Sequence, residues 1–230
     1  MTPARQTLGT RVRRVAARTF WLVSRWRLAT ERVPVDGTGV LIGAPHTSNW
    51  DFVLMLAIAW EAGLPLRWLG KHTLFRGAAG PLMRALGGIP VDRRDPTGLV
   101  DAVVARLRAG ERFYLVVTPE GTRSGNGWKS GFYRIARAAD LPVTLGYVDR
   151  TTMTTGLGPT LRLTGDVSAD MDRIRRFYAD KSGLVPARRT EPRLRDEGGA
   201  APAVDPAPGT AGPAGLRPPA APDAGASNPT

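Results

Sequence analysis

The chain has 230 residues, a formal net charge of +12 and no cysteine, which excludes disulfide bonds. With only two histidines and no cysteine, the composition offers no convincing zinc site. The charge attracts lipid surfaces, acidic carrier proteins, coenzyme A and nucleic acids alike, so charge alone does not select a partner. No uninterrupted apolar run approaches the roughly 20 residues that a membrane-spanning helix needs.

The first 32 residues contain eight arginines and a single acidic residue. On a helical wheel, arginines gather on one side and apolar residues on another. The arginines are Arg11, Arg14, Arg18 and Arg25, and the apolar residues are Leu8, Val12, Val15, Leu22, Val23 and Trp26. We therefore expect residues 1–34 to form a basic amphipathic helix that lies in a membrane interface. The alternative is a terminal helix whose aromatic residues pack on the domain.

Between residues 35 and 180, short apolar runs alternate with segments of helical periodicity. Strands are expected at Val40–Ala44, Leu66–Leu69, Gly88–Val91, Phe113–Thr118, Val143–Val148 and Leu161–Thr164. Helices are expected at Phe52–Ala62, Pro81–Leu86, Gly98–Ala109, Phe132–Ala139 and Ala169–Ala179. This alternation predicts a single α/β domain over residues 35–185, with a central, largely buried sheet flanked by helices.

Residues 186–230 follow this domain. Beyond about Glu191 they consist mainly of Pro, Ala and Gly, with almost no large apolar residue. Such a segment buries too little surface to offset the entropy lost on ordering. We therefore expect a disordered tail.

His46 lies at the turn between the first expected strand and the first expected helix. A five-residue step within one helix would separate His46 and Asp51 by about 140°, so their contact requires a helix that begins between them. Ser48 and Asn49 are suitable N-cap residues for that start. In this geometry the Asp51 carboxylate holds one imidazole nitrogen and leaves the other as a proton acceptor facing a cleft.

Three further segments accompany this pair. They read Leu-Gly-Lys-His-Thr-Leu-Phe at 69–75, Gly-Gly-Ile-Pro-Val-Asp-Arg-Arg at 87–94 and Thr-Pro-Glu-Gly-Thr-Arg-Ser at 118–124. In this order and spacing, and with the His-x4-Asp pair, they resemble the glycerolipid acyltransferase family, which includes lysophosphatidic acid acyltransferases. The resemblance covers roughly residues 35 to 180 and implies the same α/β fold class.

The resemblance implies roles for particular residues. His46 would be the general base and Asp51 its orienting partner, as in the family's His-x4-Asp motif. Gly88 to Arg93 match the second block of the family, and Pro119 to Arg123 match the third.

Within these blocks, forked guanidinium donors make Arg93 and Arg123 candidates for holding a phosphate. Lys71 stands where many members carry a lysine, and would be a second cation near the site. The expected substrate-binding set is Lys71, Arg93, Glu120, Gly121, Thr122 and Arg123.

The remaining members of this set would shape the site around the reacting groups. Glu120 would pair with an arginine or bond an acceptor hydroxyl. Backbone N–H groups at Gly121 and Thr122 could face the oxyanion, because glycine lets the backbone approach the carbonyl closely. The glycine-rich residues 124–131 are either an ordinary loop or a lid, with Trp128 and Lys129 reaching the acyl donor.

The activity that this resemblance implies is fatty acyl transfer from a thioester donor, acyl-CoA or acyl carrier protein, to a lysophospholipid hydroxyl, with 1-acylglycerol-3-phosphate as the first choice. Neither Ser124 nor Ser130 lies in a Gly-x-Ser-x-Gly setting, so an acyl-serine has no support. No cofactor, no metal and no nucleic acid is expected. An anionic membrane surface is the expected partner, and the cytoplasmic face of the plasma membrane the expected location, with peripheral or monotopic attachment.

Two departures from the family pattern leave the acceptor open. Pro90-Val91 fills the place of an aromatic residue in the second block, and residues 141–147 differ from the usual fourth block. Another amphiphilic alcohol, such as a glycolipid or an ornithine-type lipid, is therefore the alternative acceptor. From a different class, the alternative is a non-catalytic basic protein that binds membranes or nucleic acid.

Overall fold

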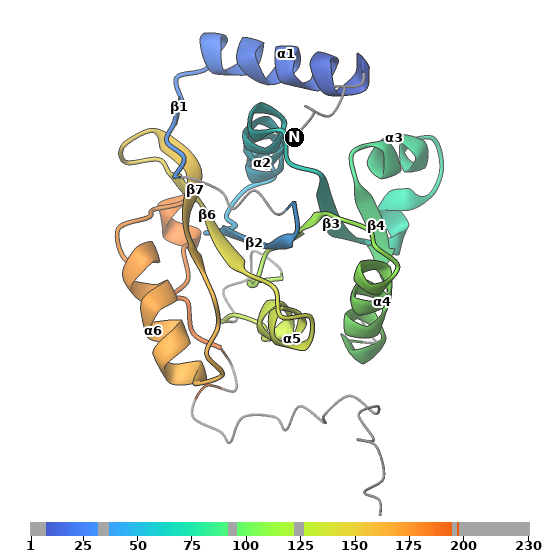
Figure 1. Ribbon diagram of the computed structural model, residues 1–230. Coiled ribbons are helices and arrows are strands. Elements are labelled where there is room, and N and C mark those ends of the chain that lie inside the picture. The colour runs from blue at the N-terminus through green and yellow to red at the C-terminus, as the bar shows by residue number, and fades with distance from the viewer. Residues whose placement is uncertain (1–7, 32–36, 92–95, 122–126, 195–196, 198–230) are drawn as a thin grey trace, which may run out of the picture.

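The computed structural model describes residues 8–31, 37–91, 96–121, 127–194 and 197. A sheet of seven strands in the order β1-β7-β6-β2-β5-β3-β4 forms its centre, with helices on both faces (Figure 1). The strands are β1 (Arg27–Leu28), β2 (Gly39–Ala44), β3 (Leu66–Lys71), β4 (Gly88–Val91), β5 (Tyr114–Val117), β6 (Val143–Asp149) and β7 (Thr154–Leu161). The helices are α1 (Leu8–Val23), α2 (Trp50–Ala62), α3 (Ala79–Ala85), α4 (Pro96–Arg108), α5 (Gly131–Ala138) and α6 (Val167–Tyr178), with short 3-10 helices η1 (His72–Phe75) and η2 (Pro186–Arg188). The expected fold class is confirmed.

Neighbouring strands of the sheet are parallel except for the antiparallel pair β6–β7. Strand β2 lies between β5 and β6 and is buried on both faces, which explains its continuous apolar sequence. Because β2 and β5 are parallel neighbours, the loops that follow Ala44 and Val117 leave the same edge of the sheet. The loops that carry His46 and Glu120 therefore lie side by side.

The two faces of the sheet form two separate apolar clusters, because successive side chains of a strand point to opposite faces. Leu41 and Val116 belong to the cluster on the α2 side. Ile42 and Leu115 belong to the other cluster, with Phe132 and Ile135 of α5. Figure 1 shows α1 and α2 on one side of the sheet and α5 on the other.

Helix α1 packs on α2 through one face and leaves the other face open. Ala17 is buried on the inner face, and Trp21 packs against the α2-side cluster. Five apolar side chains of the outer face are exposed, namely Leu8, Val12, Val15, Leu22 and Val23. Helix α1 therefore meets both expectations in part, because its inner face packs on the domain and its outer face exposes apolar side chains. No described helix is long and apolar enough to cross a bilayer.

The expected elements between residues 40 and 179 agree with the structure to within two residues at each end, with one exception. The strand expected at Leu161–Thr164 is wrong, because β7 runs from Thr154 to Leu161. Gly156, Gly158 and Pro159 give this segment a weak strand pattern. The backbone N–H groups of residues 27–31 donate to β7 only as far as the carbonyl of Leu157. Pro159 lies beyond this pairing, where its missing backbone N–H costs no hydrogen bond.

The packed chain extends past the boundary expected at residue 185. Leu194 is buried in the core, and the backbone N–H of Trp128 donates to the carbonyl of Arg193 at 2.9 Å. Arg175 also forms an ion pair with Glu197 at 2.6 Å. Leu194 packs in the core, although the segment around it is rich in Pro, Ala and Gly and its composition therefore predicts no such contact. Residues 198–230, which make up most of the expected tail, lie outside the described residues.

Candidate active site

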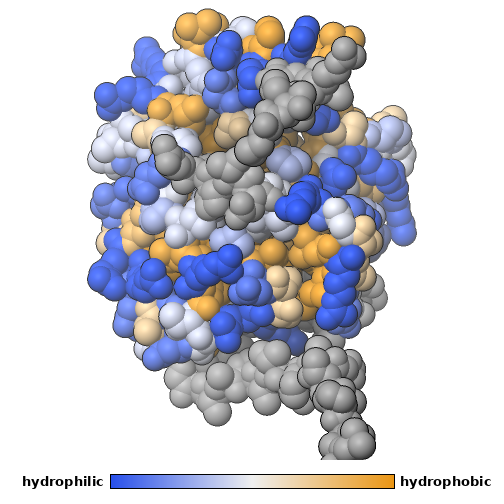
Figure 2. All heavy atoms as spheres, in the orientation of Figure 1, coloured by the Kyte–Doolittle hydropathy of each residue, from blue (hydrophilic) through white to orange (hydrophobic). Residues whose placement is uncertain are grey.

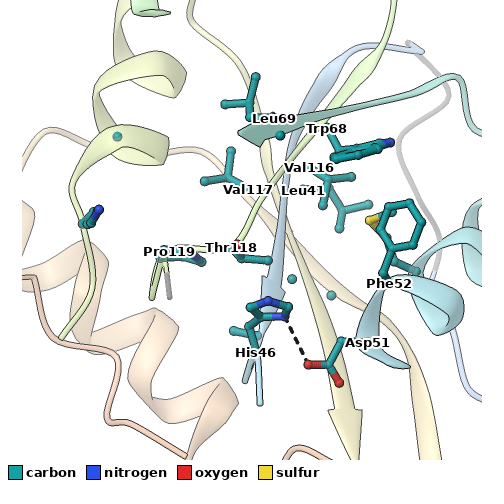
Figure 3. Close-up of a pocket in the computed structure, with 18 of the residues that line it drawn as sticks. Leu41, His46, Asp51, Phe52, Trp68, Leu69, Val116, Val117, Thr118 and Pro119 are labelled. Carbon is teal, nitrogen blue, oxygen red and sulfur yellow. Dashed lines mark ion pairs between the residues drawn. The ribbon is translucent and has the colours of Figure 1, made fainter. Parts of the chain in front are cut away.

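His46 and Asp51 meet at the start of α2, as the sequence spacing requires. Nδ1 of His46 lies 3.1 Å from Oδ2 of Asp51 (Figure 3). The same oxygen accepts hydrogen bonds from the backbone N–H groups of Thr47 and Ser48, both at 2.8 Å. Asp51 therefore holds the ring and the loop together. With Nδ1–H donating to Asp51, Nε2 of His46 is left as the proton acceptor.

The helix start differs in detail from the expected cap. Asn49 precedes α2 but makes no side-chain capping bond, whereas Oγ of Ser48 accepts from the backbone N–H of Trp50 at 3.2 Å. The carboxylate of Asp51 also lies in the first turn, where the helix dipole favours negative charge. Of the two expected capping residues, Ser48 is the one whose side chain caps the turn.

Glu120 is buried beside this pair, with 5% of its surface exposed. Its Oε1 accepts a hydrogen bond from the backbone N–H of His46 at 3.0 Å. Glu120 thus links the loop after β5 to the loop after β2 and fixes the position of the His46 backbone beyond the ends of these strands. Burial raises the pKa of the Glu120 carboxyl above its ordinary value.

The second oxygen of Glu120 is enclosed by the protein. Oε2 is buried and has no hydrogen-bond partner among the described residues. We expected this carboxyl to pair with an arginine or to bond an acceptor hydroxyl. In the described part of the chain this carboxyl bonds the His46 backbone, and Glu120 is not among the residues that line the cavity.

Gly121 forms the turn that follows. Its φ of +65° is in the left-handed region, which favours glycine. Its backbone N–H donates to the carbonyl of Thr118 at 2.9 Å. The expectation that this N–H faces the oxyanion is therefore not supported, because the turn already uses it. Thr122 and Arg123, the next two residues of the motif, lie outside the described residues, as does Arg93.

A cavity of about 900 Å³ opens beside His46 and extends along both faces of the sheet. On the α2 side it is lined by Leu41, Phe52, Met55, Trp68, Val116 and Leu157. On the α5 side it is lined by Leu69, Val117, Lys129, Arg134 and Ile135. Figure 3 shows Trp68, Val116 and Phe52 to one side of the strands and Leu69 and Val117 to the other, with His46 at the strand ends. We call these two parts the α2 lobe and the α5 lobe.

A family model described as acyltransferase matches residues 27–145, which is just over half of the chain. The match includes His46, Asp51 and Glu120. The chain belongs to the acyltransferase family. This confirms the family resemblance of the sequence motifs.

Two known proteins are similar to this acyltransferase. The 1-acyl-sn-glycerol-3-phosphate acyltransferase of Streptococcus pneumoniae (strain ATCC BAA-255 / R6) is 29% identical over 119 residues, which are 50% of this chain and 44% of that protein. The chain thus matches less than half the length of this relative. The crystal structure of the 1-acyl-sn-glycerophosphate (LPA) acyltransferase PlsC from Thermotoga maritima superposes with a TM-score of 0.54 and 16% identity, covering 75% of this chain and 76% of that one. The second likeness shows a shared fold.

Of the cations expected at the site, the structure describes only Lys71, and it lies away from the cavity. Lys71, the last residue of β3, is exposed and is not among the residues that line the cavity. Lys129, which we considered with Trp128 as part of a lid that reaches the donor, lines the cavity, and so does Arg134. Trp128, which we considered for a lid, is a core residue with 1% of its surface exposed. Arg134 had no sequence signal, because its approach to the cavity depends on where α5 packs.

Proposed function

We propose that this acyltransferase transfers a fatty acyl group from a thioester to the free hydroxyl of a lysophospholipid, with 1-acylglycerol-3-phosphate as the acceptor and His46 as the general base. The observation that carries the proposal is the His46–Asp51 pair at the mouth of a large, mainly apolar cavity. A base oriented by a carboxylate activates a hydroxyl, and an apolar cavity accepts an acyl chain.

The chemistry requires two proton movements. Nε2 of His46 removes the hydroxyl proton while the oxygen attacks the thioester carbonyl carbon. When the tetrahedral intermediate collapses, the C–S bond breaks and the imidazolium returns the proton to the leaving thiolate. Asp51 fixes the tautomer and stabilises the imidazolium between these steps. The thioester is already activated, so neither a covalent acyl-enzyme nor a metal is needed.

The α2 lobe is the part of the cavity suited to the acyl chain. Its lining includes Phe52, Met55, Trp68 and Leu157 and contains no lysine or arginine among the described residues. Burying an acyl chain against such side chains contributes about 0.8 kcal/mol for each methylene removed from water. The acyl chain enters the lobe at the strand ends, so that the thioester carbonyl lies beside His46.

The outer face of α1 supports a peripheral attachment to an anionic membrane. Five apolar side chains of this helix are exposed, at the top edge of Figure 2. Arg11 is exposed as well, whereas Arg18 pairs with Glu61 of α2 at 3.5 Å and Arg13 donates to the carbonyl of Ala85 at 2.9 Å. An interfacial helix buries its apolar stripe at the acyl boundary while arginines contact lipid phosphates. The location we propose is the cytoplasmic face of the plasma membrane, where an amphiphilic acceptor and a water-soluble donor can both reach the cavity.

The experiment that tests this function offers purified protein a panel of acceptors with both acyl-CoA and acyl carrier protein. The panel contains lysophosphatidic acid, other lysophospholipids, a glycolipid and an ornithine-type lipid. The proposal predicts turnover with lysophosphatidic acid. Turnover with only a phosphate-free acceptor would favour the alternative alcohols. No turnover with any pair, by folded protein bound to vesicles, would favour a non-catalytic membrane-binding protein.

A further inference from the structure

The α5 lobe differs in charge from the α2 lobe. Lys129, just before α5, and Arg134, in its first turn, both line this lobe. Among the described residues, neither has an ion-pair partner. Both side chains are exposed, and neither packs in the apolar core. The cavity therefore has one apolar lobe and one that carries two cations.

The chain holds Lys129 close to the reacting groups. Its backbone N–H donates to the carbonyl of Pro119 at 2.9 Å. A Cβ built on Gly121 would lie 3.1 Å from Nζ of Lys129 and 3.0 Å from its Cε, so the lysine amine occupies the space that this glycine leaves. Because Glu120 precedes Gly121 and bonds the His46 backbone, Lys129 borders the turn that supports the base.

Arg134 extends the same basic surface along α5. Its backbone N–H donates to the carbonyl of Ser130 at 3.0 Å, so Ser130 and Arg134 lie one helical turn apart on one face. Ser130 and Gly131 also line the cavity, at the end of α5 where the helix dipole is positive. The charges of both side chains and of the helix end have the same sign.

We propose that Lys129 and Arg134 bind a phosphate group of a substrate in the α5 lobe while the acyl chain occupies the α2 lobe. The inference rests on the proposed function. An ammonium and a forked guanidinium together match the charge and the donor geometry of a phosphate. The same chemistry is present in the acceptor, as a phosphate monoester, and in the donor, as the phosphates of coenzyme A or of a carrier's phosphopantetheine.

The test measures kcat and both KM values for acyl transfer from acyl-CoA to lysophosphatidic acid. We expect Lys129→Ala and Arg134→Ala each to raise one KM about tenfold or more, with kcat within about twofold of wild type. A rise in the acceptor KM assigns the phosphate to lysophosphatidic acid, and a rise in the donor KM assigns it to coenzyme A. Lys129→Arg should restore most of the affinity, and Arg108→Ala, which removes an exposed charge at the far end of α4, should change neither KM.

Two further measurements separate this inference from the proposed function. A phosphate-free substrate of the affected kind, monoacylglycerol or an acyl N-acetylcysteamine thioester, should be insensitive to Lys129→Ala. If the wild type shows no turnover, calorimetric binding of coenzyme A and lysophosphatidic acid replaces the kinetics, and tenfold weaker binding by the variants still supports the phosphate site. Unchanged KM values or binding in folded Lys129→Ala and Arg134→Ala, or wild-type protein that binds neither ligand, would overturn it.

Discussion

Asp51 contacts both the imidazole of His46 and the loop that carries it. One of its oxygens contacts Nδ1 of His46 and also the N–H groups of Thr47 and Ser48. A neutral amide at this position could keep the backbone contacts through its carbonyl oxygen. It would lose the charge that stabilises the imidazolium, and the two roles can therefore be separated by substitution.

We predict that Asp51→Asn lowers kcat by roughly 10²-fold or more while thermal unfolding shifts by only a few degrees. The measurement is steady-state acyl transfer together with a melting curve for each variant. Asp101→Asn, an exposed substitution in α4, is the matched control and should leave both unchanged. An Asp51→Asn enzyme with wild-type kcat would show that the carboxylate charge has no part in the reaction.

Glu120 gives a pH dependence that follows from its burial. A carboxyl whose pKa is raised by folding binds its proton more tightly in the native state than in the unfolded chain. Its ionisation therefore subtracts from the free energy of unfolding as the pH rises above the ordinary value of 4.5. Glutamine has no such cost and can still accept a hydrogen bond from the His46 backbone.

We predict that the free energy of unfolding of Glu120→Gln, relative to wild type, increases between pH 4.5 and pH 7.5. Urea denaturation at several pH values measures this difference, in which titrations common to both proteins cancel. Glu111→Gln, a substitution at an exposed carboxyl, should give no such trend. A difference that is flat or falls with pH would contradict the account of Glu120.

At the scale of the elements, strands were predictable where both faces of the sheet are covered. β2 is a continuous apolar run because it is buried on both sides between two parallel neighbours. β6 is also buried along most of its length, although it contains Thr144 and Asp149. β1 has only two residues, and β7 contains glycine and proline, so neither carries a strand pattern. Their pairing depends on packing between distant segments, because a Cβ on Gly156 would collide with the carbonyl oxygen of Ala29.

The candidate site was predictable to a similar extent and for a similar reason. The contact between His46 and Asp51 depends on local spacing across one helix start, which the sequence contains. The position of Lys129 depends on how the chain returns from Pro119 to α5, and the exposure of Lys71 depends on where β3 ends. These placements follow from packing between distant segments, which local patterns do not encode.

The outer face of α1 makes a prediction about membrane attachment. We expect Val15→Asp together with Leu22→Asp to lower binding to phosphatidylglycerol vesicles by roughly tenfold or more, because each substitution removes an exposed apolar contact and adds repulsion. Vesicle sedimentation at low and high salt measures this loss. Ala102→Asp together with Ala105→Asp, which adds the same two negative charges at exposed positions of α4, is the control. Equal vesicle binding by both variants would contradict the proposed role of α1.

At the scale of the whole molecule, the sheet separates two kinds of binding surface. The α2 lobe is apolar, the α5 lobe carries Lys129 and Arg134, and His46 lies at the strand ends where the two lobes meet. An acyl chain and an anionic group can thus approach the base from opposite faces of one sheet. Under the proposed function, this division would let a single cavity hold both the apolar and the charged parts of the substrates.

This division predicts an effect on acyl-chain length. Met55 lines the α2 lobe, so Met55→Trp should shorten the space for the chain. We expect roughly a tenfold lower rate with palmitoyl-CoA and little change with octanoyl-CoA, which serves as the internal control. Chain-length profiles of wild type and variant measure the effect. An equal loss at every chain length would place the acyl group elsewhere.

Comparing kcat/KM for acyl transfer between His46→Ala and His72→Ala tests whether His46 is the general base. His72 is the other histidine of the chain, exposed in η1 and outside the cavity lining. A positioned general base contributes about 10²- to 10⁴-fold in rate, so the account predicts a loss of that size in folded His46→Ala and near wild-type activity in His72→Ala. Substantial activity in His46→Ala, or an equal loss in both variants, would contradict it.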